Sequence, residues 1–291
     1  MPRVTTQDGR TIRVHEAGDP DGLPVLVCHG TPGDGSLYGP HADDADSRGI
    51  RLIGYDRPGY GGSSPQPGRS VADGARDVEA VSDALGLERL AVWGLSGGGP
   101  HALACAALLA GRVVAVASLA AVGPYGAEGL DWLDGMGEDN IEEFGATLEG
   151  RDTLVDYLEE KRSERLQGDA VQLRDELRTL LTPVDADALT GDFAEYVDES
   201  MRRALEPAVD GWLDDDLAFA APWGFDLAAI ETPVLLWHGE HDQFVPFAHG
   251  RWLAERIPNV DARLSPDDGH LTLATRRMPE VHAWLVERLQ A

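Results

Sequence analysis

Short apolar runs alternate with amphipathic segments along much of the chain, a pattern typical of a parallel sheet with helices between its strands. The apolar runs, which suit strands buried on both faces, cover residues 24–28, 52–55, 90–93, 113–117, 234–237 and, more weakly, 260–264. Residues 4–14, interrupted by Asp8-Gly9, predict a β-hairpin, and residues 71–85, 101–110 and 278–290 have helical spacing. The sequence therefore predicts an α/β fold with functional groups at the carboxyl ends of the strands.

Residues 125–222 differ from the rest of the chain. Apolar residues there recur at helical spacing and no strand-like run appears. The segment contains 27 acidic and 8 basic residues, so it carries most of the excess negative charge. We therefore expect a core made of residues 1–124 and 223–291, interrupted by an acidic, all-helical insertion over residues 125–222.

The formal net charge of −27 argues against nucleic acid as a partner, because phosphate binding needs positive patches. No run approaches the ~18 apolar residues of a membrane span, and the first residues show no apolar signal region. We expect a cytoplasmic protein that acts on a small molecule without a membrane partner. Its two cysteines, Cys28 and Cys105, lie in apolar runs and are expected to be buried thiols.

Gly94-Leu95-Ser96-Gly97-Gly98 joins a predicted strand to a predicted helix. A residue held in a strained turn leaves no room for side chains on its flanks, and the glycines here provide that room. Such a turn lifts a hydroxyl above the sheet and directs the first amides of the helix toward the group that the hydroxyl attacks. Ser96 is therefore the candidate nucleophile.

A serine hydroxyl needs a base, and the base needs a group that orients it. His270 follows the last predicted strand and is the candidate general base, while Asp242 follows the strand at 234–237 and is the candidate orienting carboxylate. Glu240, Asp267 and Asp268 compete with Asp242 for this role. His238 and His241 also lie near Asp242, but close neighbours at a strand end point to different faces, so we expect neither a metal nor a cofactor.

The oxyanion of an acyl-transfer reaction needs two hydrogen-bond donors. We expect the backbone N–H groups of Thr31 and Gly97 to provide them, because Thr31 lies in the loop that follows the strand ending at Cys28. His29 is expected to orient that loop. The turn at residues 56–63 is expected to shape a wall of the site, since its glycines and proline are ordinary turn residues.

With these motifs in place, the chain resembles the α/β-hydrolase family over nearly its whole length. The motifs that carry the resemblance lie at residues 29–33, 56–63, 94–98, 239–246 and 269–270. The resemblance implies a mostly parallel, eight-stranded sheet flanked by helices, a triad of Ser96, Asp242 and His270, and a helical cap inserted after the sixth strand. Haloalkane dehalogenases and epoxide hydrolases are similar but use an aspartate nucleophile, unlike Ser96.

The favoured function is hydrolysis of a small carboxylic ester or lactone through an acyl-enzyme on Ser96. The loop at residues 29–33 is similar to that of prolyl iminopeptidases, so an aminopeptidase is the alternative, with Glu142-Glu143 or Asp214-Asp215-Asp216 binding the substrate amine. A solvated helix face is the simpler explanation of these acids. Carbon–carbon hydrolysis, cofactor-free peroxidase chemistry and a non-catalytic receptor also stay open. Trp132, Trp212, Phe219 and Trp223 are candidate pocket walls, although ordinary packing is the simpler role for most of them.

Overall fold

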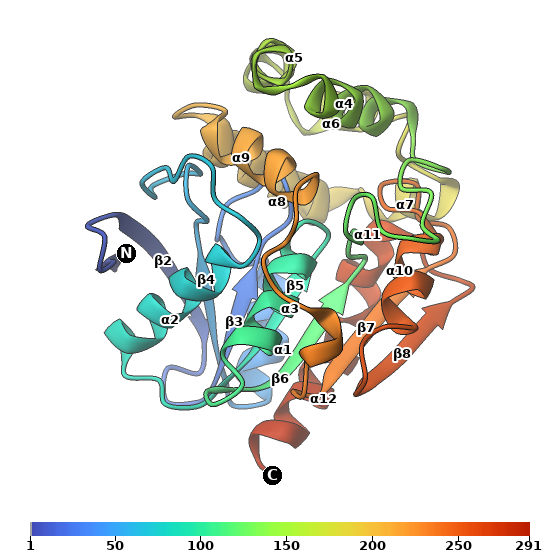
Figure 1. Cartoon of the computed structure of the whole chain (residues 1–291). Helices are drawn as coiled ribbons and strands as arrows, with labels where there is room; N and C mark the ends of the chain where they lie inside the picture. Colours follow the sequence, from blue (N-terminus) through green and yellow to red (C-terminus); the bar gives the residue numbers. More distant parts are fainter. Residues whose placement is uncertain (1) are drawn as a thin grey trace.

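The computed structural model describes residues 2–291, and over this range the chain forms an eight-stranded sheet (Figure 1). The strands are β1 (Arg3–Thr5), β2 (Thr11–Gly18), β3 (Leu23–Cys28), β4 (Ile50–Tyr55), β5 (Leu90–Leu95), β6 (Val113–Leu119), β7 (Val234–Gly239) and β8 (Val260–Ser265). Their spatial order is β1-β2-β4-β3-β5-β6-β7-β8. The pairs β1–β2 and β2–β4 are antiparallel, and the remaining pairs are parallel. This arrangement confirms the predicted fold class and the hairpin.

Strand β5 shows why the core strands are apolar throughout. Leu90 and Val92 pack into the hydrophobic core on one face of the sheet, while Ala91 and Trp93 pack into the core on the other face. Successive side chains of a strand point to opposite faces, so a strand covered on both sides needs apolar residues at every position. The ends of such strands are fixed in place by two cores at once.

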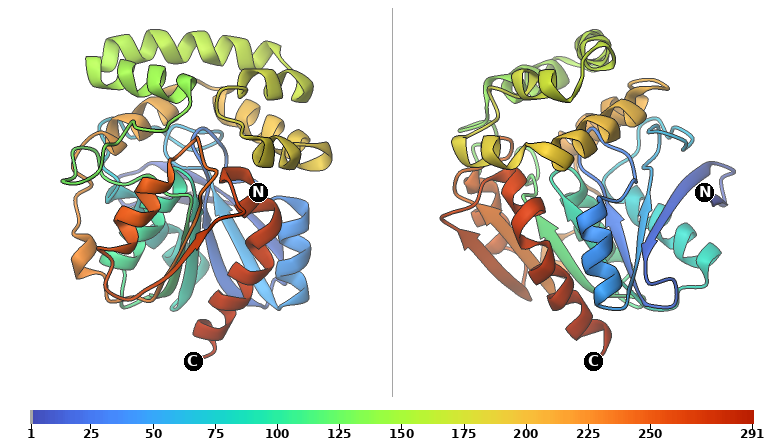
Figure 2. Two further views of the ribbon diagram at one scale, coloured as in Figure 1. Left: turned by 90° about the vertical axis from the view of Figure 1, so that its right-hand side faces the viewer. Right: turned by 180° about the vertical axis from the view of Figure 1, so that it is seen from behind.

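Helices cover both faces of the sheet, as the two views in Figure 2 show. Helices α1 (Gly39–Ser47) and α12 (Met278–Leu289) lie on one face, and α2 (Asp73–Leu85), α3 (Gly98–Leu108) and α10 (Phe247–Ala254) lie on the other, with a short η1 (Leu227–Ala229) before β7. The predicted helices at 71–85, 101–110 and 278–290 correspond to α2, α3 and α12. The apolar pattern did not predict α1, because only His41 and Ala45 of its nine residues are buried.

Six helices lie between β6 and β7, above the carboxyl ends of the parallel strands (Figure 1). They are α4 (Glu138–Glu149), α5 (Arg151–Gln167), α6 (Ala170–Glu176), α7 (Pro183–Ala188), α8 (Gly191–Leu205) and α9 (Asp210–Phe219). Helices α8 and α9 lie next to the core, and α4 and α5 lie farther from it. We propose that these helices are the cap predicted for residues 125–222, and we use that name below.

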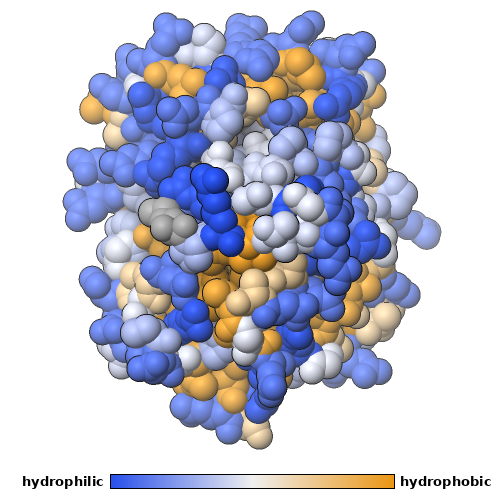
Figure 3. Space-filling model, turned by 90° about the vertical axis from the view of Figure 1, so that its left-hand side faces the viewer, coloured by the Kyte–Doolittle hydropathy of each residue, from blue (hydrophilic) through white to orange (hydrophobic). Residues whose placement is uncertain are grey.

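The face of the molecule on the β1 side is mainly hydrophilic (Figure 3). Figure 3 views the molecule from the β1 side, where hydrophilic residues dominate and hydrophobic ones form scattered groups. Within residues 2–291, no helix combines the length and the apolar character needed to cross a bilayer.

Candidate active site

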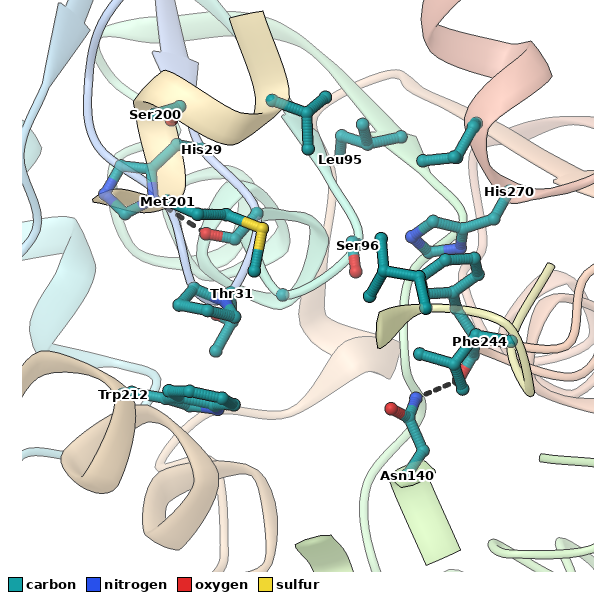
Figure 4. A pocket seen from close by; sticks show the side chains of 18 of the residues that line it. His29, Thr31, Leu95, Ser96, Asn140, Ser200, Met201, Trp212, Phe244 and His270 are labelled. Carbon is teal, nitrogen blue, oxygen red and sulfur yellow. Dashed lines mark hydrogen bonds between the residues drawn. The ribbon is translucent and has the colours of Figure 1, made fainter. Parts of the chain in front are cut away.

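Ser96 stands at the sharp turn between β5 and α3, with a backbone φ of 56°. A positive φ is unusual for a residue with a side chain and stores strain at the turn. A side chain on Gly94 would collide with the carbonyl of Gly98, and one on Gly98 would collide with the carbonyl of Cys28. The glycines thus let the turn close tightly, and Figure 4 shows the Ser96 hydroxyl directed into a cavity.

His270 and Asp242 meet at the same edge of the sheet. The His270 Nδ1 lies 2.8 Å from Oδ2 of Asp242, whose other oxygen accepts a hydrogen bond from the Val245 amide at 2.8 Å. The ring of Phe244 stacks on the imidazole with centroids 4.5 Å apart. Because Nδ1 is held by Asp242, Nε2 is the nitrogen available to the cavity that Ser96 also lines.

Burial disfavours the imidazolium form of His270, but the negative charge of Asp242 and their hydrogen bond outweigh it. The net effect raises the pKa of His270 above its usual value. The competing acids have other positions. Asp268 binds Ser265 and Arg277, with contacts of 2.6 and 2.9 Å, and Glu240 and Asp267 are exposed.

The loop after β3 is held by a buried arginine that sequence reasoning missed. Arg57 is 1% exposed and donates hydrogen bonds to the carbonyls of His29 and Gly30 and, at 2.8 Å, to Oγ1 of Thr31. Its backbone N–H donates to Nε2 of His29 at 3.0 Å, so His29 acts as the predicted orienting residue. The only sequence signal was a single cation within the turn at residues 56–63.

Asp215 of α9 connects the cap to that loop. Its carboxylate lies 2.6 Å from Arg57 and 2.7 Å from Arg69, and it accepts hydrogen bonds of 2.9 Å from the hydroxyls of Thr31 and Tyr60. Burial opposes its ionisation, but the two arginine charges dominate and hold the pKa of Asp215 well below its usual value. The side chain of Thr31 is therefore fixed, and it lies so close to Gly97 that a side chain there would collide with it.

Asp185 of α7 holds the loop that carries the histidine. One carboxylate oxygen accepts the N–H of His270 at 2.8 Å, and the other accepts those of Leu271 at 2.7 Å and Thr272 at 3.2 Å. These amides open the short helix α11 (His270–Thr272), where an anion is favourable. A side chain on Gly269 would collide with the Asp185 carboxylate, which explains the glycine before His270. No motif or spacing in the chain predicted this contact.

A cavity of about 300 Å³ lies between the strand ends and the cap, and Ser96, His270 and Thr31 face it. Two of the four predicted wall residues, Trp212 and Phe219, line it. Trp132 and Trp223 do not line it. Trp132 donates a hydrogen bond to the Gly123 carbonyl and packs on Phe144, and Trp223 packs on Phe225, so both rings complete the hydrophobic core.

The five acids considered for amine binding separate into distinct groups. Asp214 and Asp215 form ion pairs with buried Arg69, and Glu142 is exposed. Glu143 and Asp216 line the cavity.

One group of described residues, His15, Asp34 and Asp56, brings potential metal-ligand atoms within 4.8 Å of one another. The atoms already have protein partners. His15 Nε2 lies 2.7 Å from Asp56, and Asp34 accepts a hydrogen bond from Arg203 at 2.8 Å. These contacts explain the group without a metal, and of its three members Asp34 lines the cavity that Ser96 also lines.

Comparison with known proteins identifies the fold family. A family model described as alpha/beta hydrolase fold matches residues 24–276, so the chain belongs to the α/β-hydrolase fold family. A non-heme chloroperoxidase of Streptomyces lividans is 30% identical, with 97% of this chain and 96% of the relative covered. A pimeloyl-[acyl-carrier protein] methyl ester esterase of Chromobacterium violaceum is 28% identical, with 92% and 95% covered. A bromoperoxidase structure from Bacillus anthracis superimposes with a TM-score of 0.74 at 24% identity, covering 100% and 99% of the two chains.

Proposed function

We propose that the protein is a serine hydrolase that cleaves a small carboxylic ester or lactone through an acyl-enzyme on Ser96. The observation that carries this proposal is the convergence of Ser96, at its strained turn, with an Asp242-bound His270 on one cavity. The Chromobacterium relative is an esterase, and an enol-lactonase from Burkholderia xenovorans shares the fold with a TM-score of 0.65. Both names support ester chemistry.

The reaction begins when Nε2 of His270 removes the Ser96 proton and the hydroxyl oxygen attacks the substrate carbonyl. The backbone N–H groups of Gly97 and Thr31 stabilise the oxyanion, and the imidazolium is stabilised by Asp242. The C–O bond then breaks, and His270 gives its proton to the leaving alcohol. Water, deprotonated by His270, attacks the acyl-enzyme and releases the acid and the free serine.

A turnover panel tests this proposal. Short and medium p-nitrophenyl esters are compared with prolyl and other aminoacyl arylamides, for wild type and Ser96→Ala. We expect ester cleavage that falls at least ~10³-fold in Ser96→Ala. Near-full ester turnover by that variant would refute the proposal. Cleavage of arylamides in place of esters would select the aminopeptidase alternative, which uses the same serine.

The chloroperoxidase relative motivates a second candidate activity. If hydrogen peroxide replaces water as the second nucleophile, the acyl-enzyme releases a peroxy acid and regenerates Ser96. Halide oxidation in the presence of peroxide and a carboxylic acid, absent from Ser96→Ala, would support this activity. Halide oxidation that survives in Ser96→Ala would contradict it.

A further inference from the structure

Two carboxyl groups line the cavity on its cap side. Glu143 comes from α4 and Asp216 from α9, and we call them the acid pair. Asp216 is fully buried, and Glu143 is half-buried. They share this part of the cavity with the ring of Trp212, whose Nε1–H donates to Glu143 at 2.9 Å, and with the ring of Phe144.

Asp216 lacks the cationic partner that other acids of the cavity have. Across residues 2–291, no N–H or alcohol O–H donates to its carboxylate oxygens, and its one hydrogen-bond partner is the carboxyl group of Glu143. By contrast, Glu176 binds Arg165 at 2.6 Å and Asp34 binds Arg203 at 2.8 Å. A buried carboxyl group without a donor is unfavourable, since desolvation is then not offset. Two ionised carboxylates can only accept, so the acid pair can form a mutual hydrogen bond only by holding a proton.

The groups around the acid pair do not supply a matched cation. Asp139 on α4 and Tyr157 and Lys161 on α5 face Glu143, while Asp215 and Arg69 influence Asp216. Lys161 lies 3.9 Å from both Asp139 and Glu164, and Arg69 binds Asp215 at 2.7 Å. The nearby positive charges are therefore engaged with other acids.

Burial raises the pKa of Glu143 to about 7 and, together with the charge of Glu143, raises the pKa of Asp216 well above its usual value. The pair is therefore protonated in weakly acidic solution and gains negative charge as the pH rises.

We propose that the acid pair binds an ammonium group of the substrate, so that the hydrolase acts on esters whose acyl or alcohol part ends in a primary or secondary amine. This inference rests on the proposed function, because it assigns one end of the substrate whose carbonyl Ser96 attacks. An ammonium group can donate to both carboxylates, and charge-assisted hydrogen bonds are stronger than neutral ones. The ring of Trp212 contacts the same space and provides a face for the cation.

The test uses inhibitors, so it does not depend on knowing the substrate. Hydrolysis of a neutral p-nitrophenyl ester is inhibited with n-alkylammonium ions from butyl to octyl and with the 1-alkanols of equal length, at pH 6 and pH 8. The amines stay protonated at both pH values, so only the protein titrates. We expect the best alkylammonium ion to inhibit about tenfold more strongly than its alkanol at pH 8, and the preference to shrink at pH 6.

Variants of the acid pair test whether these two residues cause the preference for the alkylammonium ion. Asp216→Asn and Glu143→Gln should each remove most of the preference for the ammonium ion and leave alkanol inhibition close to wild type, which also shows that the cavity is folded. The matched control is Glu142→Gln, which removes an exposed acid next to Glu143 on the same helix and should keep the preference. Equal inhibition by amine and alkanol in wild type, or a preference that survives in both acid-pair variants, would overturn the inference.

A further experiment distinguishes failure of the proposed ester hydrolysis from failure of the ammonium subsite. If no ester is cleaved, binding of n-hexylammonium and 1-hexanol is compared by calorimetry with the same variants. A preference for hexylammonium that is lost in Asp216→Asn would support the subsite without the esterase, and equal binding of the two ligands would refute it. Ser96-dependent cleavage of neutral esters without ammonium preference refutes the inference alone.

Discussion

Asp215 and Asp216 are neighbours on α9 and both are fully buried, yet their surroundings shift their pKa values in opposite directions. Asp215 binds two arginines and two hydroxyls, and these partners hold its pKa well below the usual value. Asp216 receives no hydrogen bond from an N–H or alcohol group of the described chain, its partner is the carboxyl group of Glu143, and burial raises its pKa. Successive residues of an α-helix point about 100° apart. Because of this rotation, Asp215 joins the cap to the core and Asp216 faces the cavity.

The comparison extends to the whole site. Asp185 and Asp215 are cap carboxylates that hold core loops, one carrying His270 and the other carrying Thr31. Both carboxylates accept several hydrogen bonds from the chain itself, so their main role is structural. The acid pair, in contrast, lines the cavity. An acidic side chain of the cap can therefore hold a core loop or face a ligand, and the hydrogen-bond donors around it determine which of these two roles it has.

The largest expected effect concerns the stability of the cap–core contact. Asp215→Asn leaves Arg57 and Arg69 buried without their counter-charge, so we expect the free energy of unfolding to fall by about 3–5 kcal/mol in urea denaturation at pH 7. The matched control is Asp216→Asn, which removes a carboxyl group without a cationic partner and should change stability by less than about 1 kcal/mol. Equal destabilisation by the two variants would contradict the comparison.

If Asp215→Asn is too unstable to purify, Asp214→Asn provides a second test of the same comparison. Asp214→Asn removes weaker contacts, 3.3 Å to Arg151 and 3.6 Å to Arg69, and should be intermediate between the other two variants. A ranking with Asp216→Asn as the least stable of the three would reverse our assignment of the two neighbours.

A smaller effect is expected at Asp185, which we place as a positioning residue. In Asp185→Asn an amide N–H₂ faces backbone N–H donors, so the His270 loop shifts and kcat should fall about 10–100-fold with a smaller change in KM. The Asp185 charge also raises the pKa of His270. Its loss lowers that pKa, so the acid limb of the pH profile of kcat/KM should move to lower pH.

The pH profile separates positioning from general loss of structure. A variant that is only partly folded would lose kcat/KM at every pH and leave the limb where it is. An Asp185→Asn enzyme with wild-type kcat and an unmoved limb would show that the three backbone hydrogen bonds have no role in catalysis.

The sequence was sufficient for the core because its signals are local. A strand followed by Gly-x-Ser-x-Gly defines the turn at Ser96, and parallel strands bring Asp242 and His270 to the same edge whatever the helices do. The helices with clear apolar spacing, α2, α3 and α12, could be predicted from local signals in the same way. Helix α1 could not, because its sequence is mostly polar.

The cap contacts could not be predicted because they join segments more than 80 residues apart. Asp185 and His270, or Arg57 and Asp215, have no spacing in common, and Asp214, Asp215 and Asp216 are identical residues in a row. Only the three-dimensional placement of donors distinguishes them. The same applies to Trp132 and Trp223, whose aromatic rings suit a pocket wall as well as the core in which they lie.

The measurement that tests the central claim most directly is covalent labelling of the nucleophile. The protein is treated with a fluorophosphonate and digested with trypsin, and the peptide covering residues 90–112, in which Ser96 is the only serine, is examined by mass spectrometry. We predict stoichiometric labelling of Ser96, none in Ser96→Ala and much slower labelling in His270→Ala. Ester hydrolysis by an enzyme that stays unlabelled at Ser96 would contradict the account.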